Sequence, residues 1–83
     1  MPYIQPENRK MMDRIVSQMA LLGVSANGDL NYILYKYCKH CITPSYNNYK
    51  NFCGELRQCA TEIERRMVAP YEDQKIKENG DVE

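Results

Sequence analysis

The longest amphipathic pattern in the chain lies between residues 45 and 69. Its larger apolar residues recur every three or four positions, the repeat that lays one stripe along an α-helix. They are Tyr49, Phe52, Cys53, Leu56, Cys59 (or Ala60), Ile63 and Met67. Ser45 is placed to accept a hydrogen bond as the N-cap. Pro70 is expected to end the helix, because the residue before a proline is pushed out of the α region.

Two shorter patterns precede this helix. Residues 6–22 form the first, which begins with Pro6 in the first turn and ends before Gly23, a typical left-handed C-terminal residue. The second covers residues 29–41, with Asp29 at the positive end of the helix dipole. The connector from residue 43 to residue 45 is short, which favours an antiparallel hairpin of the second and third helices.

The last pattern covers residues 70–83. Tyr71 and Ile76 are its larger apolar anchors within the helical part, and acidic residues come early and lysines late, which suits a short helix followed by a tail. So few anchors predict that this segment docks on another surface, most simply a second subunit. Together the patterns predict one all-α domain over residues 1–83, a three-helix bundle-like fold with a long third helix and a short C-terminal helix.

Gly54 lies inside the predicted long helix, where glycine is less favourable than alanine. It adjoins Cys53 on the apolar side. We therefore expect another helix to cross closely at Gly54, so that an added methyl group would clash.

Composition narrows the function classes. The chain has 83 residues, with 11 basic and 11 acidic side chains. It therefore lacks the excess of positive charge that attracts nucleic-acid backbones. No uninterrupted apolar run is longer than that from Met19 to Leu22, which is far too short to cross a membrane. No signal-peptide pattern opens the sequence. We expect a cytoplasmic protein that binds neither membranes nor nucleic acid.

Four cysteines occur in the chain, at positions 38, 41, 53 and 59. In a cytoplasmic protein thiols are favoured over disulfides, and their positions on helical stripes predict buried core thiols. The alternatives are a pair of disulfides or a zinc site in which Cys38 and Cys41 flank His40. The zinc alternative is weak, because two cysteines six residues apart, Cys53 and Cys59, point about 240° apart around a helix.

The usual constellations of catalysis are absent from the sequence. His40 is the single histidine, and side chains one or two positions away on a helix diverge from it. The adjacent acidic residues diverge likewise, and no glycine-rich phosphate loop is present. The sequence therefore predicts a protein that is not an enzyme and carries no cofactor.

Several short runs resemble one known family. They are GDLNY (Gly28–Tyr32), SY (Ser45–Tyr46), GEL (Gly54–Leu56) and the ending ERRMVAPYEDQKIKENGDV. Together with the opening MPYIQPENRK, they are similar to a family of small bacterial and phage proteins across nearly the whole chain. The resemblance implies a small soluble protein, of bacterial or phage origin, but supplies no activity, cofactor or catalytic residue. The cysteines and His40 depart from the family pattern.

Candidate binding residues come from the tyrosines and the basic residues. The chain has seven tyrosines, more than one small core can hold, and tyrosine suits interfaces because its ring is apolar and its hydroxyl can stay wet. Arginine can hold a carboxylate or phosphate with two hydrogen bonds. The candidates are Tyr32, Tyr35, Tyr46, Arg65, Arg66, Tyr71 and Lys75. The alternatives are tyrosines half-buried on the domain's own surface and a local pair between Arg66 and Glu62.

These features lead to three functional hypotheses. The first is a self-associating, non-enzymatic interaction protein that binds or inhibits a host protein, as a phage-encoded protein in the host cytoplasm would. The second is an oligomer that sequesters a nucleotide-like anion between subunits. The third is a zinc- or thiol-dependent regulator.

Overall fold

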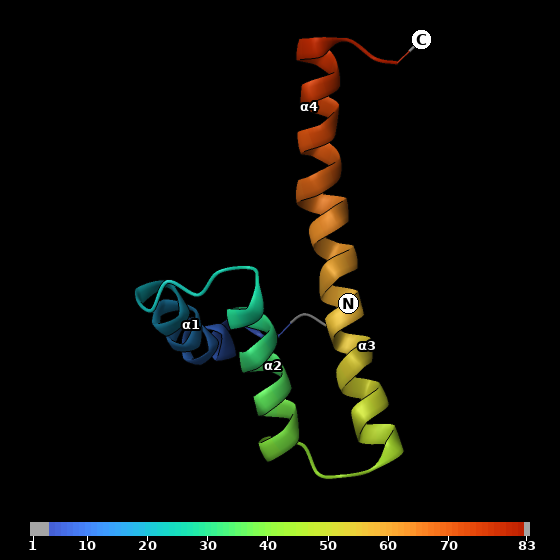
Figure 1. Cartoon of the computed structure of the whole chain (residues 1–83). Coiled ribbons are helices and arrows are strands. Elements are labelled where there is room, and N and C mark those ends of the chain that lie inside the picture. Colours follow the sequence, from blue (N-terminus) through green and yellow to red (C-terminus); the bar gives the residue numbers. More distant parts are fainter. Residues whose placement is uncertain (1–3, 83) are drawn as a thin grey trace. The chain divides into compact units, whose positions relative to one another are not determined.

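The computed structural model describes residues 4–82, and these residues form an all-α protein (Figure 1). Its elements are α1 (Pro6–Leu21), α2 (Gly28–Cys41), α3 (Tyr46–Ile63), the π-helical turn η1 (Glu64–Val68) and α4 (Ala69–Asn79). The last three run on without a break as one long third helix of 34 residues. The expected all-α class and the long third helix are confirmed.

The described residues divide into two units, residues 4–49 and residues 50–82, and each is described by itself below. The first holds α1, α2 and the first turn of α3. The second holds the remainder of the long helix and the residues that follow it. The expectation of a single domain over residues 1–83 stays a prediction, and its residues 1–3 and 83 lie outside the described part.

In the first unit, glycine ends α1 as the sequence predicts. Gly23 adopts a left-handed conformation, with φ of +66°. Its N–H donates to the carbonyl of Ala20, and the N–H of Val24 donates to that of Met19, at 3.1 and 3.0 Å. This pair of bonds is the Schellman arrangement, which satisfies carbonyls that the helix end leaves unpaired.

Side-chain caps start the next two helices. The Oδ1 atom of Asn27 accepts a hydrogen bond from the N–H of Asp29 at 2.8 Å where α2 begins. The Oγ atom of Ser45 accepts from the N–H of Asn48 at 3.0 Å where α3 begins, so the predicted Ser45 cap is confirmed. Each cap satisfies one of the N–H groups that have no partner inside the helix.

Pro70 does not end the long helix, which corrects the sequence prediction. The residues before it widen into η1, and Pro70 then lies in the first turn of α4. A proline inside a regular helix clashes with the carbonyl four residues earlier and lacks an N–H to donate. A π-helical turn supplies the extra backbone room, which is one recognised way for a helix to absorb such a residue. The helix therefore continues to Asn79.

The expected hydrophobic core is not formed among the described residues, none of which is fully buried. In the first unit the partly buried side chains on and near α2 recur once per turn, at Leu30, Leu34, Cys38 and Ile42. Cys41, Cys53 and Cys59 are exposed. The prediction of buried core thiols is thus wrong for these three cysteines, because a helical repeat sets the side of the helix on which a residue lies and does not set its burial.

The predicted clash at Gly54 is also absent. Apart from its chain neighbours and the backbone of its own helix, a Cβ atom added there would meet no atom within 4 Å among the described residues. The backbone of Gly54 is ordinary helix, since the positive φ angles of the described glycines belong to Gly23 and Gly80. Gly54 therefore lowers the helix propensity of this segment and does not mark a close crossing of two helices.

Candidate functional site

A shallow, open hollow lies along one side of α2. It is lined by Tyr32, Tyr35, Lys36, Lys39 and His40. Their spacing of three, four, seven and eight residues from Tyr32 places them on one face over two turns. Asp29, in the first turn, is the one carboxylate of α2. The face is therefore both aromatic and basic.

Lys36 and Tyr32 define the geometry at the N-terminal part of this face. The Nζ atom of Lys36 donates to the Oη atom of Tyr32 at 3.1 Å and lies 5.4 Å from the centre of its ring. Lys36, Lys39 and His40 take no part in the ion pairs formed among residues 4–82. The positive charges of Lys36 and Lys39 are thus not cancelled by a neighbouring carboxylate. Tyr35 is 68% exposed.

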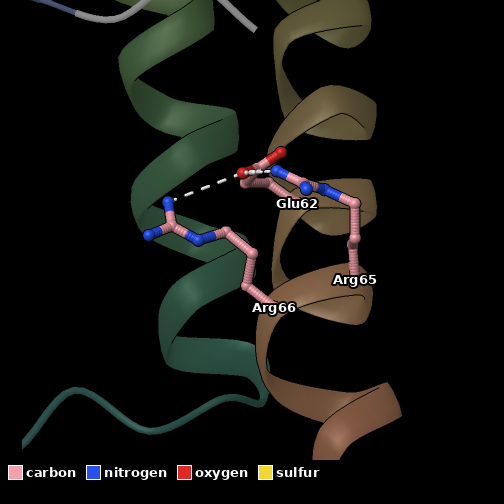
Figure 2. A network of polar contacts seen from close by, with 3 residues as sticks. All are labelled: Glu62, Arg65 and Arg66. Atoms are coloured by element: carbon pink, nitrogen blue, oxygen red, sulfur yellow. Dashed lines mark hydrogen bonds and ion pairs between the residues drawn. The ribbon is translucent and has the colours of Figure 1, made fainter.

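Arg65 and Arg66 are engaged with one carboxylate in the second unit. Figure 2 shows Glu62 between the two guanidinium groups, with its Oε1 atom 2.6 Å from Arg65 and 3.5 Å from Arg66. Only 16% of the Glu62 side chain is exposed, whereas both arginines are more than half exposed. The local pair between Arg66 and Glu62, which the sequence offers as an alternative to a binding role for Arg66, is present. Arg65 joins it from one residue earlier.

Tyr71 and Lys75 face each other one turn apart on α4. The Nζ atom of Lys75 lies 5.5 Å from the centre of the Tyr71 ring and 3.2 Å from the Oε2 atom of Glu78. This arrangement resembles that of Tyr32 and Lys36, except that the charge of Lys75 is paired. Tyr46, the first residue of α3, is exposed. The predicted residues therefore fall into local groups on their own helices.

Sequence reasoning missed the basic half of the α2 face. Lys36, Lys39 and His40 are not among the binding residues that the sequence predicts, although Lys39 and His40 lie in the last turn of α2, where basic side chains suit the negative end of the helix dipole. The missed signal is the helical spacing that joins them to Tyr32 and Tyr35.

The four cysteines are free thiols. No group of three or more histidine, cysteine or acidic side chains within residues 4–82 is arranged to hold a metal ion. In the same part of the chain, no helix has the length and apolar character that a membrane span needs.

The comparisons with known proteins give a family but no activity. Neither the curated proteins nor the solved structures include a match to this chain. A family model matches residues 1–82, nearly the whole length. The chain belongs to that family, which is described as Domain of unknown function (DUF6899).

Proposed function

We propose that this chain is a non-enzymatic interaction protein that works as an assembly of identical copies, joined through the apolar faces of its helices. The observation that carries the proposal is the exposed apolar stripe of the long helix. Leu56, Ile63 and Met67 lie on this stripe, and all three are exposed.

A single helix cannot cover its own apolar face, because every side chain of the stripe points away from the helix axis. In the unit of residues 50–82 the helical part, up to Asn79, is one continuous helix, so it has no second layer of its own. Covering a leucine or isoleucine contributes about 1.5–3 kcal/mol. Isolated helices are marginal in water without such packing, which favours a partner along this stripe.

A second copy of the chain is the partner that these features favour. Identical stripes can cover each other about a two-fold axis, the commonest symmetry of soluble oligomers. Charge does not oppose the pairing, since residues 50–82 contain six basic and seven acidic side chains in an interleaved order. A domain of this size often needs oligomerisation to complete its core.

Sedimentation equilibrium over a range of concentrations tests the proposal. The native mass should be a multiple of the 9.7 kDa chain. Ile63→Glu should lower this mass, because a carboxylate in an apolar contact loses its hydration without gaining a partner. Gln58→Glu is the matched control: it adds the same charge about 180° from the stripe and should leave the mass unchanged. A single-chain mass at every concentration would contradict self-association.

The same proposal includes the binding of a host protein. The resemblance to small bacterial and phage proteins supports an assembly that acts in the bacterial cytoplasm, which is the host cytoplasm if a phage encodes the protein. There it would bind and inhibit a host protein. Cross-linking in bacterial cells should then yield a host protein in a fixed ratio to the chain. Recovery of cross-links between copies of the chain alone would count against this role.

A further inference from the structure

The basic and aromatic side chains on one face of α2 are not needed for the self-association proposed above. The residues that line this face are Tyr32, Tyr35, Lys36, Lys39 and His40. We infer that this face binds a small phosphate-bearing ligand with a planar ring, a nucleoside phosphate. The inference does not depend on the oligomeric state proposed above.

The charge of the face favours a phosphate. Lys36 and Lys39 are three residues apart and therefore project to the same side of the helix. Neither is paired with a carboxylate among the described residues. Lysine binds phosphate as a mobile point charge, and an anion here replaces water around two ammonium groups without breaking an existing ion pair. His40, one residue further on, supplies ring nitrogens at the same end.

The rings of the face favour a planar group beside the phosphate. Tyr32 and Tyr35 are 61% and 68% exposed. Exposed aromatic side chains offer a surface on which a nucleobase stacks, because every base has a π-face. The hydroxyl of Tyr32 is held by Lys36 at 3.1 Å, so one ring and one ammonium group already lie together. The hollow is shallow, which predicts modest affinity.

The second unit supplies an internal control. Tyr71 and Lys75 repeat the spacing of four residues, with an ammonium-to-ring distance of 5.5 Å against 5.4 Å for Tyr32 and Lys36. Lys75 is paired with Glu78 at 3.2 Å, however, and the hollow on α2 has no such carboxylate in its lining. If binding needs unpaired charge, the α2 pair should bind the ligand and the α4 pair should not.

Isothermal titration of the full chain with ADP at low ionic strength tests the inference. Lys36→Gln with Lys39→Gln should weaken ADP binding at least about tenfold, as expected for losing two charge-assisted contacts. Lys75→Gln should change it less than about twofold, since an exposed, paired lysine contributes little. Raising the salt from about 50 to about 300 mM should weaken binding by the native chain, because exposed charges are screened.

Three further probes separate the parts of the ligand. Adenosine should bind much more weakly than ADP, and pyrophosphate should bind independently of Tyr35. Tyr35→Leu should therefore weaken ADP binding and leave pyrophosphate binding unchanged. If the double variant alters the helical circular dichroism or the native mass, the single variant Lys39→Gln replaces it in the titrations.

The inference is overturned if ADP does not bind at low salt or if Lys75→Gln weakens ADP binding as much as the α2 substitutions do. Equal affinity for ADP and pyrophosphate would remove the role of the rings. Tighter binding of a glutamate-rich peptide, with displacement of ADP, would assign the face to an acidic protein partner.

Discussion

The backbone N–H of Ala69 donates its hydrogen bond to the carbonyl of Glu64, five residues earlier, and Pro70 follows directly. A regular helix would pair residues four apart. The wider turn therefore stands where the ring of Pro70 needs room. It also changes the angle at which α4 presents its side chains relative to α3, because one π-helical turn takes in about one extra residue.

Replacing Pro70 by alanine should stabilise the helix. Alanine restores a backbone donor at position 70 and removes the ring that a regular helix cannot hold. The helical circular dichroism should not fall, and the new amide of residue 70 should be protected in hydrogen exchange. Ala60→Pro is the control within α3 and should cost about 3 kcal/mol or more. A lower melting temperature for Pro70→Ala would show that the assembly needs the π-helical turn.

Gly54→Ala should raise the free energy of unfolding by about 0.5–1 kcal/mol, the usual advantage of alanine over glycine in a helix. The structure leaves open space for the added Cβ atom. Gly23→Ala should have the opposite effect, because Gly23 has φ of +66°, which strains other residues. Urea unfolding measures both. Destabilisation by Gly54→Ala would mean that a second copy crosses the helix there.

Glu62→Gln should lower stability modestly, by about 0.5 kcal/mol, because it removes the negative charge that Arg65 and Arg66 share and leaves a neutral amide oxygen as their acceptor. Both arginines are exposed, so solvent screening keeps the effect small. The difference from the native chain should shrink at high salt. Glu78→Gln, which removes the more exposed pair with Lys75, should have a smaller effect. A loss unaffected by salt would contradict an electrostatic origin.

Replacing Cys41 by serine should change the free energy of unfolding by no more than about 0.5 kcal/mol, as for most surface substitutions, because this residue is exposed and lies outside the stripe of the long helix. Cys53 and Cys59 are exposed as well, but they lie on the stripe that we propose a second copy covers, so replacing both by serine should cost more. Cys38, which is partly buried, should cost more when replaced by alanine, about 1 kcal/mol. An equally small effect at Cys53 and Cys59 would place these two thiols outside the contact between copies. A chelator that unfolded the native chain would instead restore the zinc hypothesis.

Deleting residues 71–83 should lower both the native mass and the melting temperature. Tyr71 and Ile76 are exposed on α4, and a second copy is the surface that we expect to cover them. Deletion of residues 80–83 alone, which follow α4, should leave both quantities unchanged. An unchanged mass and melting temperature after the longer deletion would show that α4 does not help to join the copies.

The sequence by itself determined the local elements of this protein. The helical repeats, the Ser45 cap and the left-handed Gly23 depend on neighbouring residues only, and the structure reproduces them. The effect of Pro70 does not follow from the sequence pattern, because it depends on whether the backbone before it can widen. The same sequence pattern fits a broken helix and a continuous one.

Only the tertiary structure decided which stripes have a covering layer. A helical repeat shows that Cys53 or Leu56 lies on an apolar face, but burial depends on a partner that the repeat does not specify. In the structure both are exposed, and the charges of Lys36 and Lys39 remain unpaired on α2, whereas Arg65 and Arg66 are paired with Glu62. Periodicity fixes the direction in which a side chain points along its own helix, and contacts between side chains decide what it meets.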